Sequence, residues 1–361
     1  MSTMRHDDTT TTEHPVLGSP ARRLLTHSAV RNGLAAATVT AVGLLAVYTV
    51  DDFTVGSVAM LTAYACVAMG LTVLIGGNGQ ISLGHAALMA VGAYTMALFL
   101  EPRTTALREV PVLSVALALV LAVLVTLCVG LLIGLAAARL RGPYLAGATL
   151  SFGVAVPGLV TYFDHWFNGE QGLPVPPPDM PTALDNALWL PDRFVALIGV
   201  VAVGVTFFVL ANVKRSAVGR HWAAVRDDEI AAQLCGLSIP REQVTAFAVS
   251  AATAGLGGAV LALFLQGVNP HSFDLRLSLG VLAAVVIGGL GSLRGAIWGS
   301  ALVVFLQKVL ADMDVDENLP SASYGLLLIV VMLAAPGGIQ GLLSRLGDRL
   351  PRRSTHHQGD N

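Results

Sequence analysis

The chain has 361 residues, a net charge of −2 and a mean hydropathy of +0.70. Hydrophobic residues make up 54% of it and charged residues only 12%, about half of the roughly 25% that soluble proteins contain. Such a chain cannot cover a water-facing surface with polar groups, which excludes an ordinary soluble protein. The composition predicts a chain that faces lipid.

The two ends of the chain are polar and differ from everything between them. Residues 1–32 are Thr-rich and mixed in charge, and they lack the short apolar core of a signal peptide. We expect a disordered cytosolic tail there and a second cytosolic tail over residues 341–361. The intervening residues 33–340 are predicted to form one transmembrane domain.

This central region contains ten candidate membrane spans. A membrane helix needs about 20 mostly apolar residues, and the last three candidates are short. The pattern predicts an all-α, polytopic membrane helix bundle of about ten transmembrane segments, at residues 33–50, 54–75, 81–100, 111–138, 142–163, 193–212, 241–266, 277–290, 295–310 and 322–335.

The distribution of Lys and Arg supports an even number of spans. Cytosolic loops of membrane proteins carry an excess of these residues. If the N-terminus is cytosolic and every segment crosses, 16 of the 21 basic residues lie inside; the exceptions are Arg103, Arg108, Arg193, Arg276 and Lys308. We therefore expect both termini in the cytosol.

Two long polar connections interrupt the spans. The external loop 164–192 is rich in proline between Pro174 and Pro181, which favours extended backbone. It is either a passive linker or a docking or gating surface. The cytosolic loop 213–240 has a helical pattern from Val218 to Leu237, with an imperfect apolar stripe formed by Trp222, Val225, Ile230, Leu234 and Leu237. That helix is predicted to lie on the membrane surface or to dock to a cytosolic partner.

Several kinds of chemistry are missing from the sequence. Neither lysine stands in a phosphate-binding loop motif, because Arg215 follows Lys214 and Val309 follows Lys308. No His pair outside the tails has metal-ligand spacing, so we expect no metal. Ionisable residues within the spans are scarce, and nothing resembles a proton relay. If transport is active, its energy comes from another chain.

Glycine-rich turns follow two of the spans on the predicted cytosolic side, at 76–79 and 288–291. They suggest an internal repeat or a chance resemblance. The first turn leads into Asn78–His85, where polar side chains gather at the start of an apolar helix. Free N–H groups at a helix N-terminus attract anionic groups such as a carboxylate. This segment is the best local candidate for contact with a solute.

The run from Gly76 to Tyr94 (GGNGQISLGHAALMAVGAY) resembles the signature of branched-chain amino acid ABC-transporter permeases of the LivM type. Further matches follow in order from about residue 54 to 343, among them Arg141–Tyr144, Asn168–Gly172 and Gly219–Gly236. The chain departs from the family at Gly337, where the family often has Arg, and in its Pro-rich insert. Several motifs in one order make the resemblance specific.

The resemblance implies an ABC importer permease fold in a bacterial inner membrane. It also implies three kinds of partner besides lipid: a LivH-type permease, two cytosolic ATPase subunits that hold ATP and Mg²⁺, and an extracytoplasmic binding protein. No cofactor on this chain and no nucleic acid are expected. Within loop 213–240, the resemblance to ABC-permease coupling segments assigns ATPase coupling to Arg226, Glu229, Ala231, Ala232 and Gly236.

A substrate pathway is harder to place, since the motif does not fix which residues touch the solute. Candidate pathway residues are Gln80, Ser82, Gly84, His85, Tyr144 and Thr149, and packing is an equal alternative for them. The expected function is import of Leu, Ile and Val as a non-enzymatic permease subunit. Two alternatives stay open: the same machine importing urea, amides or other amino acids, and a passive channel or secondary carrier.

Overall fold

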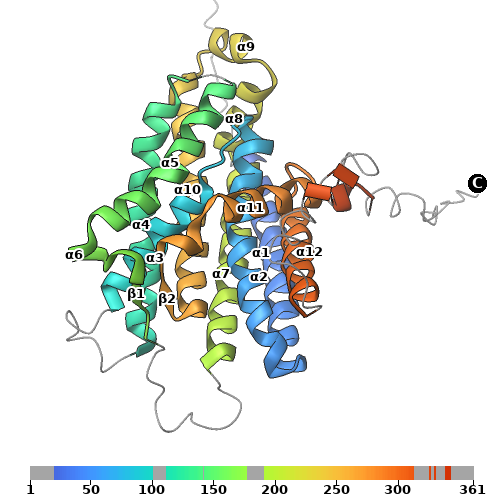
Figure 1. The fold of residues 1–361 in the computed structure, drawn as a ribbon. Coiled ribbons are helices and arrows are strands. Elements are labelled where there is room, and N and C mark those ends of the chain that lie inside the picture. Colours follow the sequence, from blue (N-terminus) through green and yellow to red (C-terminus); the bar gives the residue numbers. More distant parts are fainter. Residues whose placement is uncertain are drawn as a thin grey trace, which may run out of the picture.

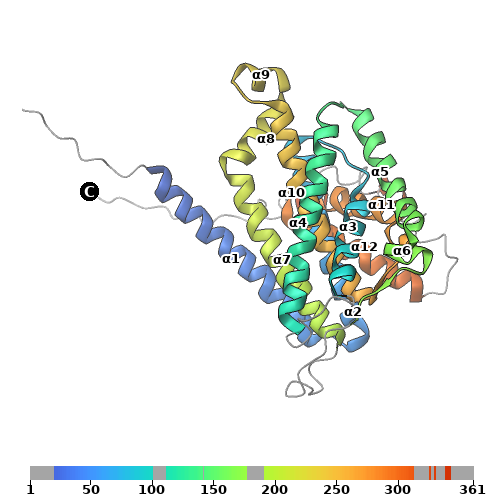
Figure 2. The same ribbon diagram turned by 90° about the vertical axis from the view of Figure 1, so that its left-hand side faces the viewer.

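The computed structural model describes residues 20–100, 111–140, 142–176 and 191–312, with short pieces between 325 and 342. Long helices run side by side in one bundle (Figure 1), and α8 and α9 protrude from one end of it in both views (Figure 2). The long helices are α1 Pro20–Thr49, α2 Asp52–Val73, α3 His85–Leu100, α4 Pro111–Ala137, α5 Pro143–Tyr162, α7 Pro191–Arg215, α10 Ile239–Leu265, α11 Leu275–Gly288 and α12 Leu293–Asp312.

Shorter elements connect these helices. They are the π-helix Leu74–Asn78, α6 Asp164–Phe167, the 3₁₀ turns Gly169–Gln171 and Pro270–Phe273, the strands β1 Leu173–Pro174 and β2 Gly267–Val268, α8 Ala217–Asp227 and α9 Glu229–Leu234. The two strands pair antiparallel, with Leu173 opposite Val268.

The prediction of an all-α polytopic bundle is confirmed. Within the described part of the chain, eight helical segments are long and apolar enough to cross a membrane, and α3 is a shorter apolar helix. These helices account for nine of the ten predicted spans. The tenth, 322–335, lies mostly outside the described residues, so the number ten stays a prediction.

The first helix begins earlier than hydropathy predicts. It starts at Pro20, so residues 20–32 are helical and the expected disordered tail is wrong for them; residues 1–19 lie outside the description. Hydropathy misplaces this boundary because a helix can continue past the apolar stretch that defines its span. In Figure 2 α1 runs obliquely along the edge of the bundle.

The core sits around α10, which packs against α2, α3, α4 and α7. Small residues make this close packing possible. A Cβ on Gly92 of α3 would overlap the backbone of Gly255 of α10, and one on Gly258 would overlap the Met89 backbone. Small residues at helix interfaces let backbones approach closely in membranes. The glycines of the third and seventh predicted spans thus serve packing.

The start of the external loop, 164–176, folds onto the bundle instead of forming an extended linker. Asn168 and Gly172 have φ values of 60° and 71°. The Asn168 Nδ2 donates to the Gly172 carbonyl over 2.8 Å, and Val175 N donates to the Gln266 carbonyl over 3.0 Å. Residues 177–190, with most of the prolines, lie outside the described part.

The loop 213–240 forms two helices, so the prediction of one continuous helix is wrong. Asp228 breaks it: its Oδ1 accepts hydrogen bonds from Ile230 N and Ala231 N over 2.8 and 3.0 Å. That side-chain cap starts α9 in a new direction. The predicted stripe also splits, because Trp222 and Val225 are buried whereas Ile230 and Leu234 are 72% and 85% exposed.

Candidate functional site

The polar segment 79–84 between α2 and α3 is not helical. The π-helix ends at Gly79, which has a φ of 81°, and α3 begins only at His85. The prediction that the third span begins at residue 81 is therefore wrong. The reason is that the N–H groups of Leu83 and Gly84 bond to side-chain hydroxyls and not to a preceding turn. Departures from α-helical hydrogen bonding such as π-turns are frequent at functional sites.

His85 lies at the centre of a buried polar cluster and is 1% exposed. Its Nδ1 lies 3.1 Å from Ser82 Oγ, and its Nε2 lies 2.8 Å from Ser250 Oγ of α10. Whichever nitrogen carries the proton donates to its hydroxyl, and the other accepts. The Phe247 ring lies against the imidazole at a centroid distance of 6.5 Å. Both ring nitrogens are therefore satisfied without any charged partner.

Three hydroxyls occupy the N-terminal end of α3. Thr149 Oγ1 of α5 accepts from Leu83 N over 3.1 Å, and Ser278 Oγ of α11 accepts from Ala86 N over 3.0 Å. Ser82 Oγ accepts from Gly84 N over 3.4 Å. Gly84 is required here, because a Cβ would overlap the Thr149 carbonyl oxygen. Residues from α5, α10 and α11 thus meet at one helix end.

Gln80 extends the cluster toward α10. Its Nε2 donates to Asn78 Oδ1 over 2.6 Å and to the Gln243 carbonyl over 3.0 Å. The Nδ2 of Asn78 is buried and has no acceptor among the described residues. We call Asn78, Gln80, Ser82, His85, Thr149, Ser250 and Ser278 the polar cluster.

The structure brings together five of the six predicted pathway residues: Gln80, Ser82, Gly84, His85 and Thr149. Tyr144 is not among them, since its side chain is 78% exposed on α5. Sequence reasoning missed Ser250 and Ser278. The signal that would have found them is a lone polar residue in an apolar span, because polar groups inside a membrane need internal partners.

The predicted coupling residues lie on α8, on α9 and, for Gly236, in the turn after α9, and they play different structural parts. Glu229, Ala231 and Gly236 are exposed, whereas Ala232 is buried in a small core with Val225 and Ile239. The φ of Gly236 is 85°, so a side chain there is strained. The exposed apolar pair Ile230 and Leu234 forms the tip of this region, and the sequence analysis did not place it in the coupling set.

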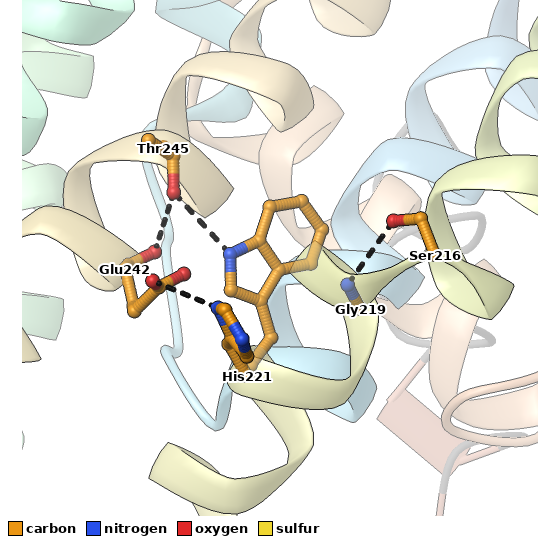
Figure 3. A network of polar contacts seen from close by, with 6 residues as sticks. Ser216, Gly219, His221, Glu242 and Thr245 are labelled. Carbon is orange, nitrogen blue, oxygen red and sulfur yellow. Dashed lines mark hydrogen bonds and ion pairs between the residues drawn. The ribbon is translucent and has the colours of Figure 1, made fainter. Parts of the chain in front are cut away.

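Hydrogen bonds fasten α8 to the first turns of α10 (Figure 3). Trp222 Nε1 donates to Thr245 Oγ1 over 3.3 Å, and Thr245 Oγ1 donates to the Glu242 carbonyl over 3.1 Å. His221 Nδ1 lies 3.3 Å from Glu242 Oε1. The Ser216 hydroxyl caps α8 by accepting from Gly219 N. We call the end of α7 from Lys214 together with α8 the α7–α8 corner. This corner is therefore tied to α10, which also carries Ser250 of the polar cluster.

Residues 53–335 match the family described as branched-chain amino acid transport system / permease component. The chain belongs to this permease family. It is 32% identical to the high-affinity branched-chain amino acid transport system permease protein LivM of Salmonella typhimurium (strain LT2), over 83% of this chain and 72% of that protein. The LivM protein of Escherichia coli (strain K12) is 32% identical over 87% of this chain and 75% of its own length.

A more distant match is LivH of Escherichia coli (strain K12), which is 25% identical over 78% of this chain and 92% of its own length. No solved structure matches the chain significantly. The permease family and the apolar helices together make this a multi-pass inner-membrane protein. As a transport permease subunit it is not itself an enzyme. Among the described residues, no group of three or more His, Cys, Asp or Glu side chains is placed to hold a metal.

Proposed function

We propose that this permease is the membrane subunit of an ATP-driven importer of branched-chain amino acids that an extracytoplasmic binding protein delivers. The observation that carries the proposal is the 32% identity to LivM over 83% of the chain. Neither lysine of the chain stands in a phosphate-binding loop. ATP and Mg²⁺ therefore belong to two partner ATPase subunits, and a LivH-type permease completes the membrane part.

The α8–α9 end of the bundle faces the cytosol and receives the ATPase subunits. Ile230 and Leu234 support this placement, because two large apolar side chains one helical turn apart are exposed at the tip of α9. Such a pair fits an apolar groove on a partner better than it fits water. Ala232 then holds α9 in place from its buried side, and Glu229 and Ala231 flank the docking tip.

In this proposal the polar cluster lies on the substrate pathway, and its internal hydrogen bonds have to open before a substrate can bind. Two backbone N–H groups at the N-terminal end of α3, those of Leu83 and Ala86, point at hydroxyls from α5 and α11. When α5 and α11 move away, these donors and the positive end of the α3 dipole become available to the substrate carboxylate. Phe247 beside His85 offers an apolar contact for a branched side chain.

The cluster contains amide, hydroxyl and imidazole groups, and none of its seven residues is a carboxylate that would pair with a substrate ammonium group. A neutral cargo such as urea would find hydrogen-bond partners in the same place. Urea is therefore the informative competitor in any test of cargo.

The test is uptake of labelled leucine by cells with and without this gene, with excess isoleucine, valine or urea as competitor. We expect deletion to abolish uptake, and isoleucine and valine but not urea to compete. Uptake by proteoliposomes of the whole complex should require internal ATP, since a channel or secondary carrier would not need it. Unchanged leucine uptake in cells without another leucine system would contradict the cargo.

A further inference from the structure

The two glycine-rich turns that stand far apart in the sequence touch each other in the structure. A Cβ on Gly76 would overlap the backbone of Gly291. Only glycine permits this approach. The adjacent Gly77 has no such neighbour, because the nearest atom to its Cβ position is Val73 Cγ1 at 3.7 Å.

Each turn receives one cation from the α7–α8 corner. Lys214, in the last turn of α7, donates from Nζ to the Gly291 carbonyl. Arg226, near the end of α8, donates from Nη1 to the Gly76 carbonyl. The Arg226 side chain also covers Gly79, with its Cγ 3.1 Å from the Cβ position of that glycine. The corner thus holds both turns through charge-assisted hydrogen bonds.

Both cations line one cavity of about 520 Å³, together with glycines of the two turns and with Trp222. Among the described residues, no carboxylate lines that cavity. Asp227 binds Arg226 from outside it, at Nε and Nη2 over 2.9 and 2.7 Å. That pair fixes the guanidinium plane and leaves Nη1 for Gly76. Carbonyl oxygens of the turns are therefore the acceptors that hold the cations in place.

Each turn is also connected to the polar cluster. The first turn runs directly into Gln80 and His85, and the second follows α11, whose Ser278 caps α3. A rigid-body shift of the α7–α8 corner therefore pulls on the backbone at both approaches to the cluster. Packed elements with discrete arrangements transmit small displacements in this way.

We infer that Lys214 and Arg226 are positioning residues that form a two-cation clasp, which transmits movement of the coupling helices α8 and α9 to the polar cluster. The inference rests on the proposed function and deepens it. It assigns a role to Lys214, which lies outside the predicted coupling set, and it gives Arg226 a partner inside the permease instead of on the ATPase.

The test uses the complete transporter in proteoliposomes, with both permeases, the ATPase subunits and the binding protein. The readout is leucine taken up per ATP hydrolysed. Lys214→Met and Arg226→Met each remove one cation and keep an unbranched, flexible side-chain stem. In the double variant we expect uptake per ATP to fall by about tenfold while ATP hydrolysis continues, because two charge-assisted hydrogen bonds are lost.

Arg220→Met is the matched control, since Arg220 lies on the same corner but its guanidinium, within the described part of the chain, donates to the Arg215 carbonyl of its own segment. It should keep the wild-type ratio. Lys214→Arg and Arg226→Lys should restore part of the coupling. A second pair of variants needs no charge change: Gly76→Ala should uncouple by pushing the turns apart, and Gly77→Ala should not.

Each outcome is decisive. Wild-type complex without ATP-dependent uptake would reject the proposed function, whatever the variants do. With a working wild type, a double Met variant that keeps its uptake per ATP would overturn the clasp. So would loss of assembly on co-purification in the Met variants, since that result assigns the two cations a purely structural role.

Discussion

The polar cluster and the α7–α8 corner both join distant parts of the chain, but they use opposite chemistry. The cluster is buried and makes its bonds with neutral hydroxyl, amide and imidazole groups. The corner lies at the end of the bundle and uses Lys214 and Arg226, with the Arg226 side chain 43% exposed. A charge inside the membrane costs several kcal/mol, so the neutral groups sit in the interior and the cations near its end.

If ATP hydrolysis on partner subunits drives the importer, as we propose, this difference indicates where its energy enters. An importer driven by protons or sodium places ionisable groups along its pathway, and no residue of the polar cluster is an acid or a base of that kind apart from His85. That imidazole is already paired on both nitrogens. The charged, part-exposed corner is the place where an outside subunit can act. Variants that disable one of the two regions and leave the other working test this division of roles.

The largest effect should come from the cluster side. Gly84→Ala places a methyl group against the Thr149 carbonyl, and overpacking of this kind costs about 1–3 kcal/mol. We expect leucine uptake to fall by more than about tenfold, with ATPase subunits still bound. Gly153→Ala is the control, because its Cβ would lie 3.6 Å from the nearest atom, the Leu83 carbonyl oxygen. Similar uptake in the two variants would show that the α3–α5 contact does not control transport.

At the tip of α9 we expect variants to lose binding of the ATPase subunits. Ile230→Asp and Leu234→Asp put charge on exposed apolar positions without disturbing the buried core. We expect affinity for the ATPase subunits to fall about tenfold or more, as at other interface anchors, measured by co-purification. Gln233→Asp on the same exposed helix is the control. Normal co-purification of both tip variants would place the docking surface elsewhere.

Ala232 shows why the choice of position matters in that experiment. It is 4% exposed beside Val225 and Ile239, so Ala232→Glu buries a charge and damages the fold of the corner. Loss of transport in that variant would not identify a docking contact. The exposed pair reports on docking, and Ala232 reports on stability.

A smaller effect is expected on stability, and it tests whether His85 is held by its hydrogen bond to Ser250 or by packing alone. Ser250→Ala leaves His85 Nε2 buried without its partner, which costs about 1–3 kcal/mol and lowers the melting temperature by a few degrees. Ser151→Ala is the control, because its hydroxyl is exposed and donates to the Gly147 carbonyl of its own helix. In a His85→Leu background Ser250→Ala should cost almost nothing further. Additive losses would contradict the bond.

Hydropathy predicted the helices well because the apolar length of a span is decided by consecutive residues. It could not predict that residues 79–84 leave the helix. Thr149 satisfies Leu83 N of this segment from 66 residues away, and Ser278 satisfies Ala86 N at the start of α3 from 192 residues away. The same distance hid Ser250, 165 residues from His85. Local pattern indicated the region of the candidate site, and tertiary contacts selected its members.

The break between α8 and α9 was also not predicted, although the signal for it is local. Asp228 followed by Glu229 has the composition of a helix start, with a capping side chain and an acid in the first turn. The apolar spacing across Trp222 and Ile230 concealed it. Recognising that cap would have separated the buried half of the stripe from the exposed half.

The smallest effect is expected at Tyr144, the one predicted pathway residue that the structure sets apart. Its side chain is 78% exposed on α5, away from the polar cluster. Tyr144→Ala removes no contact to Gln80, Ser82 or His85, so we expect leucine uptake to change by less than about twofold. His85→Ala in the same assay serves as the positive comparison. A loss in Tyr144→Ala as large as in His85→Ala would mean that the pathway also follows the exposed face of α5, where the second permease would have to complete it.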